Sequence, residues 1–142
     1  MYKRQAVDDL LAQSGFSPHD VVIEITERVG IESPEAFQKA LTTFKSRGYR
    51  VAVDDVGAGH ASLSSLAAIE PDFLKFDVSL IRGIDRSRIK QGLVSSLRLL
   101  ADRMDARVVA EGVEREEEHR VLVDIGIELG QGFLFHREGG SH

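Results

Sequence analysis

Cysteine is absent from the 142-residue sequence. This absence excludes disulfides, thiolate zinc sites and cysteine nucleophiles, and it is compatible with a reducing cytoplasm. No apolar run approaches the length of a membrane span, and Met1–Gln5 lacks the apolar stretch of a signal peptide. We therefore expect a cytoplasmic fragment that makes no membrane contact itself, although a longer parent protein could be membrane-anchored.

Basic residues are in the minority, with 18 Lys and Arg against 23 Asp and Glu and a formal net charge of −5. This balance argues against a nucleic-acid polymer as partner but allows a small phosphorylated ligand bridged to carboxylates by cations. The length and the 42% apolar content suit one globular domain. We place that domain at residues 1–136 and interpret the glycine-rich residues 137–142 as a disordered or linker tail.

Apolar, β-rich runs alternate with helical patterns along the chain. The runs predict strands at 21–26, 51–53, 73–76, 108–110 and, more weakly, within 125–135. The spacing of apolar residues predicts helices from Pro34 to just before Gly48, over 89–104 and over 115–125, and a short one around Val7 to Leu11. The alternation predicts an α/β fold, namely part of a (β/α)8 TIM-type barrel with about five parallel strands. A doubly wound open sheet is the alternative.

Charged residues cluster where the predicted strands end. They are Glu24, Glu27, Asp54, Asp55, Lys75, Asp77, Glu111 and Glu114. Ligands bind at this edge of parallel α/β sheets, and converging carboxylates favour a hard divalent ion such as Mg²⁺ or Mn²⁺. Two such ions could activate water for phosphoryl displacement, with a lysine nearby to neutralise charge. Any one of these acids could instead cap a helix or lie in a solvated loop, so spacing alone predicts only a metal-dependent α/β enzyme.

Five short segments resemble, in order, the motifs of the EAL family of cyclic di-GMP phosphodiesterases. They are Glu24-Ile25-Thr26-Glu27, Asp54-Asp55-Val56-Gly57-Ala58-Gly59, Lys75-Phe76-Asp77, Ala110-Glu111-Gly112-Val113-Glu114 and Gln131-Gly132-Phe133-Leu134-Phe135. The resemblance covers nearly the whole chain, from about Leu10 to Phe135, and an ordered set of motifs is far more specific than one short pattern.

This resemblance implies a role for each matching residue in a two-ion Mg²⁺ or Mn²⁺ site. The metal ligands would be Glu24, Asp54 and Asp55. The catalytic residues would be Lys75, Glu111 and Asp55, with Lys75 orienting water or a phosphate oxygen. Gln131 and Asp77 would contact substrate, and Glu27 would stabilise the loop that begins at Asp55. For Glu27 and Glu114, a purely structural role as cap or ion pair is an equal alternative.

Two departures from the family pattern affect these expectations. Val56, Ala58 and His60 stand where the family usually has phenylalanine, threonine and tyrosine, which removes groups that would order the loop. The strand with the Glu-Ala-Leu motif and the following asparagine-bearing strand have no counterpart before Tyr2, so we expect a truncated domain. Exposed strand edges or the loop after Asp55 would then favour self-association.

Two functional hypotheses follow. In the first, the parent protein is a phosphodiesterase that converts cyclic di-GMP to linear pGpG, joined to GGDEF or sensory domains, and this fragment alone is inactive. In the second, the chain is a degenerate cyclic di-GMP receptor or a protein-interaction module without catalysis.

Overall fold

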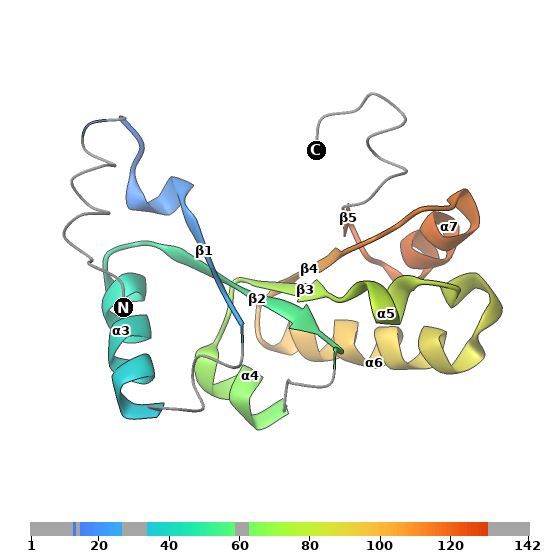
Figure 1. Ribbon diagram of the computed structural model, residues 1–142, viewed down its shortest axis with the longest axis horizontal. Coiled ribbons are helices and arrows are strands. Elements are labelled where there is room, and N and C mark those ends of the chain that lie inside the picture. Colours follow the sequence, from blue (N-terminus) through green and yellow to red (C-terminus); the bar gives the residue numbers. More distant parts are fainter. Residues whose placement is uncertain (1–12, 14, 27–33, 59–62, 131–142) are drawn as a thin grey trace.

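The fold is built on one five-stranded sheet in which all neighbouring strands are parallel. The computed structural model describes residues 13, 15–26, 34–58 and 63–130. The strands are β1 (Val22–Ile25), β2 (Arg50–Val56), β3 (Phe73–Phe76), β4 (Arg107–Ala110) and β5 (Leu129–Gly130). They lie in the sheet in sequence order (Figure 1). A doubly wound sheet reverses its strand order, so the sequential order confirms the barrel-type prediction.

Helices connect the strands. They are α3 (Pro34–Ser46), α4 (Leu63–Ile69), α5 (Val78–Ile81), α6 (Arg88–Arg103) and α7 (Glu116–Ile125), with short 3-10 helices η1 (Pro18–Asp20) and η2 (Ile84–Arg86). In Figure 1, α3, α4 and α6 lie along the same side of the sheet. The predicted start at Pro34 is confirmed, and α6 and α7 begin within one residue of prediction. No helix in the described ranges is long and apolar enough to cross a membrane.

The central strands are buried on both faces. Val51, Ala52 and Val53 of β2 and the β3 residues Leu74 and Phe76 are almost completely inaccessible to solvent. Continuous apolar runs of this kind are typical of parallel sheets that are covered on both sides. Polar side chains at the ends of β2, β3 and β4 are therefore held by a closely packed scaffold.

One strand is longer than the sequence predicts. β2 extends to Val56, beyond the predicted 51–53, and its pairing with β3 shifts register between Val53 and Val56. Asp54 and Asp55 lie in this irregular stretch, and Asp55 has a positive φ of 55°. The fifth strand, predicted within 125–135, is confirmed as β5 at Leu129–Gly130, while Ile125 is the last residue of α7. Residues 131–135, the predicted N-terminal helix and the tail lie outside the described residues.

Candidate metal centre

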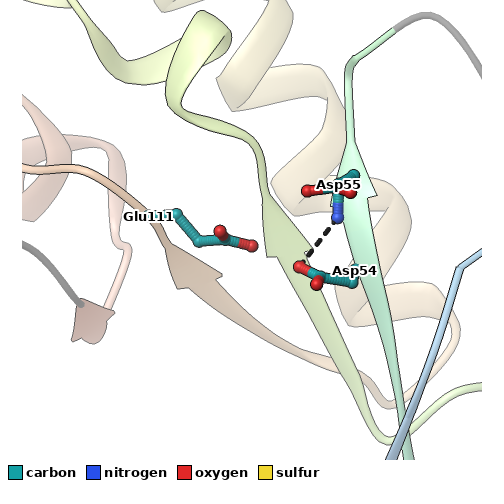
Figure 2. A group of neighbouring side chains, drawn as sticks. All are labelled: Asp54, Asp55 and Glu111. Atoms are coloured by element: carbon teal, nitrogen blue, oxygen red, sulfur yellow. Dashed lines mark hydrogen bonds between the residues drawn. The ribbon is translucent and has the colours of Figure 1, made fainter.

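Three carboxylates converge at the ends of neighbouring strands. Asp54 and Asp55 lie near the end of β2, and Glu111 directly follows β4. Figure 2 shows Glu111 reaching across β3 toward the two aspartates. One carboxylate oxygen from each residue lies within 4.8 Å of the others. Asp54 Oδ1 also accepts a hydrogen bond of 2.9 Å from the backbone N–H of Asp55, which fixes the Asp54 side chain.

The electrostatics of Glu111 fit a bound cation. Its burial, together with the hydrogen bond and negative charge of Asp54, raises the pKa of Glu111 to about 8. Glu111 Oε1 is buried, and no hydrogen-bond partner for it exists among the described residues. A divalent ion between the carboxylates would offset their mutual repulsion and provide a partner for Glu111 Oε1. Carboxylate oxygens suit hard ions such as Mg²⁺, Mn²⁺ and Ca²⁺. The residues present therefore fit a divalent metal.

Lys75 joins Glu24 to this group. Its Nζ lies 2.6 Å from Glu24 Oε1 and 4.0 Å from Asp54 Oδ1. Burial alone would lower the pKa of Lys75, but the hydrogen bond that Lys75 donates to Glu24 and the negative charges of Asp54, Glu24 and Glu111 outweigh it and raise the pKa. The lysine is therefore charged at neutral pH. Glu24 does not belong to the three-carboxylate group among the described residues, and its side chain is 52% exposed.

Asp77 and Glu114 make local structural contacts. Asp77 caps α5, since its Oδ2 accepts a hydrogen bond of 2.9 Å from Ser79 N. Hydrogen bonds from Ser79 lower the pKa of Asp77. Glu114 pairs with Arg82 at 3.1 Å, which agrees with the structural alternative for this residue. Of the other predicted residues, Glu27 and Gln131 lie outside the described part of the chain.

Sequence reasoning missed Glu118, the one buried charged side chain in the described ranges, at 2% exposure. Its carboxylate accepts hydrogen bonds from Gly83 N at 2.8 Å and from Glu114 N and Arg115 N at 3.1 Å each. These bonds outweigh burial, so the pKa of Glu118 is lowered. Arg115 also pairs with Asp85. The signal was present in the sequence, because an acid three residues after the N-cap, here Arg115, is the acceptor position of a capping box.

Known proteins share both the sequence and the fold of this chain. The family model described as "EAL domain" matches residues 2–138. Over 129 residues the chain is 36% identical to "Cyclic di-GMP phosphodiesterase PdeA" of Borreliella burgdorferi, and over 130 residues it is 35% identical to "Cyclic di-GMP phosphodiesterase PdeR" of Escherichia coli. These matches cover 91% and 92% of the chain but 19% and 20% of the relatives. The chain therefore spans about a fifth of the length of these curated relatives.

Solved structures give the same result. BlrP1 of Klebsiella pneumoniae, solved as a complex with calcium and cyclic di-GMP, matches with a TM-score of 0.86 and 40% identity over 92% of this chain and 33% of that one. The EAL domain of DcpA from Mycobacterium smegmatis matches with a TM-score of 0.85 and 32% identity over 92% of this chain and 58% of that one. Family, sequence and fold agree over nearly the whole chain. The chain belongs to the EAL domain family.

Proposed function

We propose that this chain supplies the carboxylate-bearing strands of a phosphodiesterase site that hydrolyses cyclic di-GMP to linear pGpG with a divalent metal. The convergence of Asp54, Asp55 and Glu111 beside a charged Lys75 carries this proposal. Support comes from relatives named cyclic di-GMP phosphodiesterases. BlrP1 has also been solved with cyclic di-GMP and either calcium or manganese.

In this proposal Asp54, Asp55 and Glu111 hold the divalent ion, Mg²⁺ or Mn²⁺, with Glu24 as a further ligand from β1. The metal supplies Lewis-acid activation of water and neutralisation of phosphate charge. In the reaction one water molecule adds across one phosphodiester, one ester P–O bond breaks, and the opened ring carries a free hydroxyl and a terminal phosphate. The carboxylates are held at fixed positions by β2 and β4, so little rearrangement is needed to bind the ion.

Lys75 complements the carboxylates. Its ammonium lies between Glu24 and Asp54, so it presents a fixed positive charge toward an attacking water or a phosphate oxygen. Asp77 and Gln131 would contact the substrate, and Glu27 would brace the loop after Asp55. We expect little turnover by the chain alone, because the carboxylates of Glu24, Asp54, Asp55 and Glu111 are fewer ligands than two six-coordinate ions require.

The test measures binding and turnover together. Purified chain is titrated with Mn²⁺ and then with cyclic di-GMP by calorimetry, and pGpG is quantified by chromatography. Asp54→Asn should abolish Mn²⁺ binding and any Mn²⁺-dependent pGpG formation. Asp102→Asn is the matched control, because Asp102 is an exposed α6 residue paired with Arg98. Normal Mn²⁺ binding by Asp54→Asn would refute the proposal. An unaltered chain that does not bind Mn²⁺, or does not bind cyclic di-GMP, would refute it as well.

A receptor without turnover is the second candidate. The observation that favours it is the loop after Asp55, where Val56 and Ala58 replace the aromatic ring and hydroxyl expected from the family pattern. Tight binding of cyclic di-GMP without metal, and with no pGpG even at high Mn²⁺, would favour the receptor over the phosphodiesterase.

A further inference from the structure

The short helix α5 lies between the two loops that carry the metal-site carboxylates. It follows β3, the strand between β2 and β4. One neighbouring loop follows β2, which carries the two aspartates, and contains Gly57. The other begins at Glu111 and contains Gly112. The helix therefore lies between the loop that follows the aspartates and the loop that begins with the glutamate.

Leu80 packs directly on the first loop. A methyl group built on Gly57 would lie 2.5 Å from Leu80 Cγ, so the leucine covers the Cα of this glycine with no room for a side chain. Leu80 is buried, and Ser79 Oγ donates a hydrogen bond of 3.5 Å to the carbonyl oxygen of Gly57. The position of α5 thus fixes the backbone two residues after Asp55.

Val78 packs on the second loop in the same way. A methyl group on Gly112 would lie 2.9 Å from Val78 Cβ, at the residue next to Glu111. Residues two apart in a helix point in roughly opposite directions. Val78 and Leu80 therefore extend from opposite sides of α5, one to each loop.

Glu118 holds the far end of α5 in place. Its carboxylate joins Gly83 N, just past this helix, to Glu114 N and Arg115 N in the second loop. The helix is thus attached to the Glu111 loop at both of its ends. A change in the size of the α5 side chains that contact Gly57 and Gly112 would therefore shift the two loops, and with them the neighbouring carboxylates.

We propose that α5 is the spacer that sets the separation between the Asp54–Asp55 pair and Glu111, with Val78 and Leu80 as its positioning residues. The spacer determines the affinity of the centre and its preference between small and large divalent ions. Mg²⁺ requires oxygen ligands at about 2.0–2.1 Å in a strict octahedron, whereas Ca²⁺ accepts about 2.3–2.6 Å. Removing methyl groups from the spacer lets the loops shift and relaxes this discrimination. The inference rests on the proposed metal centre.

The experiment compares Val78→Ala and Leu80→Ala with Leu80→Met, which retains the volume, and with Leu41→Ala. Leu41 is a buried residue of α3 in the same core, so its variant controls for lost stability. Mn²⁺ affinity is measured by electron paramagnetic resonance, with Mg²⁺ and Ca²⁺ as competitors. Both alanine variants of the spacer should bind Mn²⁺ about 10- to 100-fold more weakly and show a changed Mg²⁺-to-Ca²⁺ ratio. Leu80→Met and Leu41→Ala should match the unaltered chain. Unchanged affinity and ratio in both spacer variants would overturn the inference while the proposed function stands.

Amide NMR of the metal-free chain provides a measurement that does not depend on the proposed function. If the unaltered chain binds no Mn²⁺, the proposed function fails and NMR alone decides on the spacer. Val78→Ala, which alters contact with the Glu111 loop, should shift the amide signals of Gly57 and Ala58 on the other side of α5. Shifts confined to the Glu111 loop and to α5 itself would overturn the inference.

Discussion

Replacing Glu118 with alanine should strongly destabilise the chain. The substitution leaves three partly buried backbone N–H groups without their acceptor, those of Gly83, Glu114 and Arg115. Each unsatisfied donor costs about 1–3 kcal/mol, and after relaxation and entry of water we expect a total of about 3–5 kcal/mol. Glu117→Ala is the matched control one position earlier, because Glu117 is 59% exposed and makes only a surface ion pair with Arg115, worth about 0–1 kcal/mol.

Urea denaturation followed by circular dichroism measures the difference. The midpoint should fall much further for Glu118→Ala than for Glu117→Ala. Because hydrogen bonding lowers the pKa of Glu118, the stability that it contributes is fully present above the ordinary glutamate pKa and is lost as pH falls through the lowered one. The gap between the unaltered chain and Glu118→Ala should therefore narrow in acid. Equal midpoints for the two variants at pH 7, or a gap independent of pH, would refute the reasoning.

Three further predictions concern the metal centre and the sheet edge. Because the pKa of Glu111 is raised, the metal-free chain should lose stability as pH rises from about 4.5 to about 8, and excess Mn²⁺ should remove this loss. Identical melting profiles with and without Mn²⁺ across this pH range would contradict the prediction. Lys75→Met should abolish pGpG formation in a turnover assay. Calorimetry should show Mn²⁺ binding that is unchanged or tighter, because the substitution removes the lysine cation beside Asp54. Among the described strands β1 pairs only with β2, and its Val22 side chain is exposed. Analytical sedimentation should therefore show self-association of the chain, and Val22→Lys should reduce it. A monomer at all concentrations would contradict an open sheet edge at β1.

The fold was largely predictable because its strands are nearly pure apolar runs. Phe73–Phe76 and Arg107–Ala110 match their predicted strands closely, since burial on both faces leaves no alternative pattern. α5 was missed because four residues are too few to show helical periodicity. The extension of β2 beyond Val53 was also missed. It depends on a register shift against β3, which is a tertiary feature that no local run of residues encodes.

The sequence predicted that three carboxylates would converge at one sheet edge, but it predicted their contacts only in part. Asp54, Asp55 and Glu111 follow apolar runs, so the topology of a parallel sheet brings them to one edge. The sequence did not show which acidic side chains contact one another and which make other contacts. Glu24 contacts Lys75 rather than the three-carboxylate group, and Asp77 caps a helix, because side-chain reach and local hydrogen bonding decide these partners.

The sequential strand order has a consequence for synthesis. Each strand from β2 to β5 pairs with the strand made immediately before it, and none must wait for a later segment to be inserted beside it. A chain emerging from the ribosome can therefore extend its sheet in the order of translation. The aspartates of β2 would be in place before the segment with Glu111 has left the exit tunnel, so the metal centre is completed only after β4 has joined the sheet.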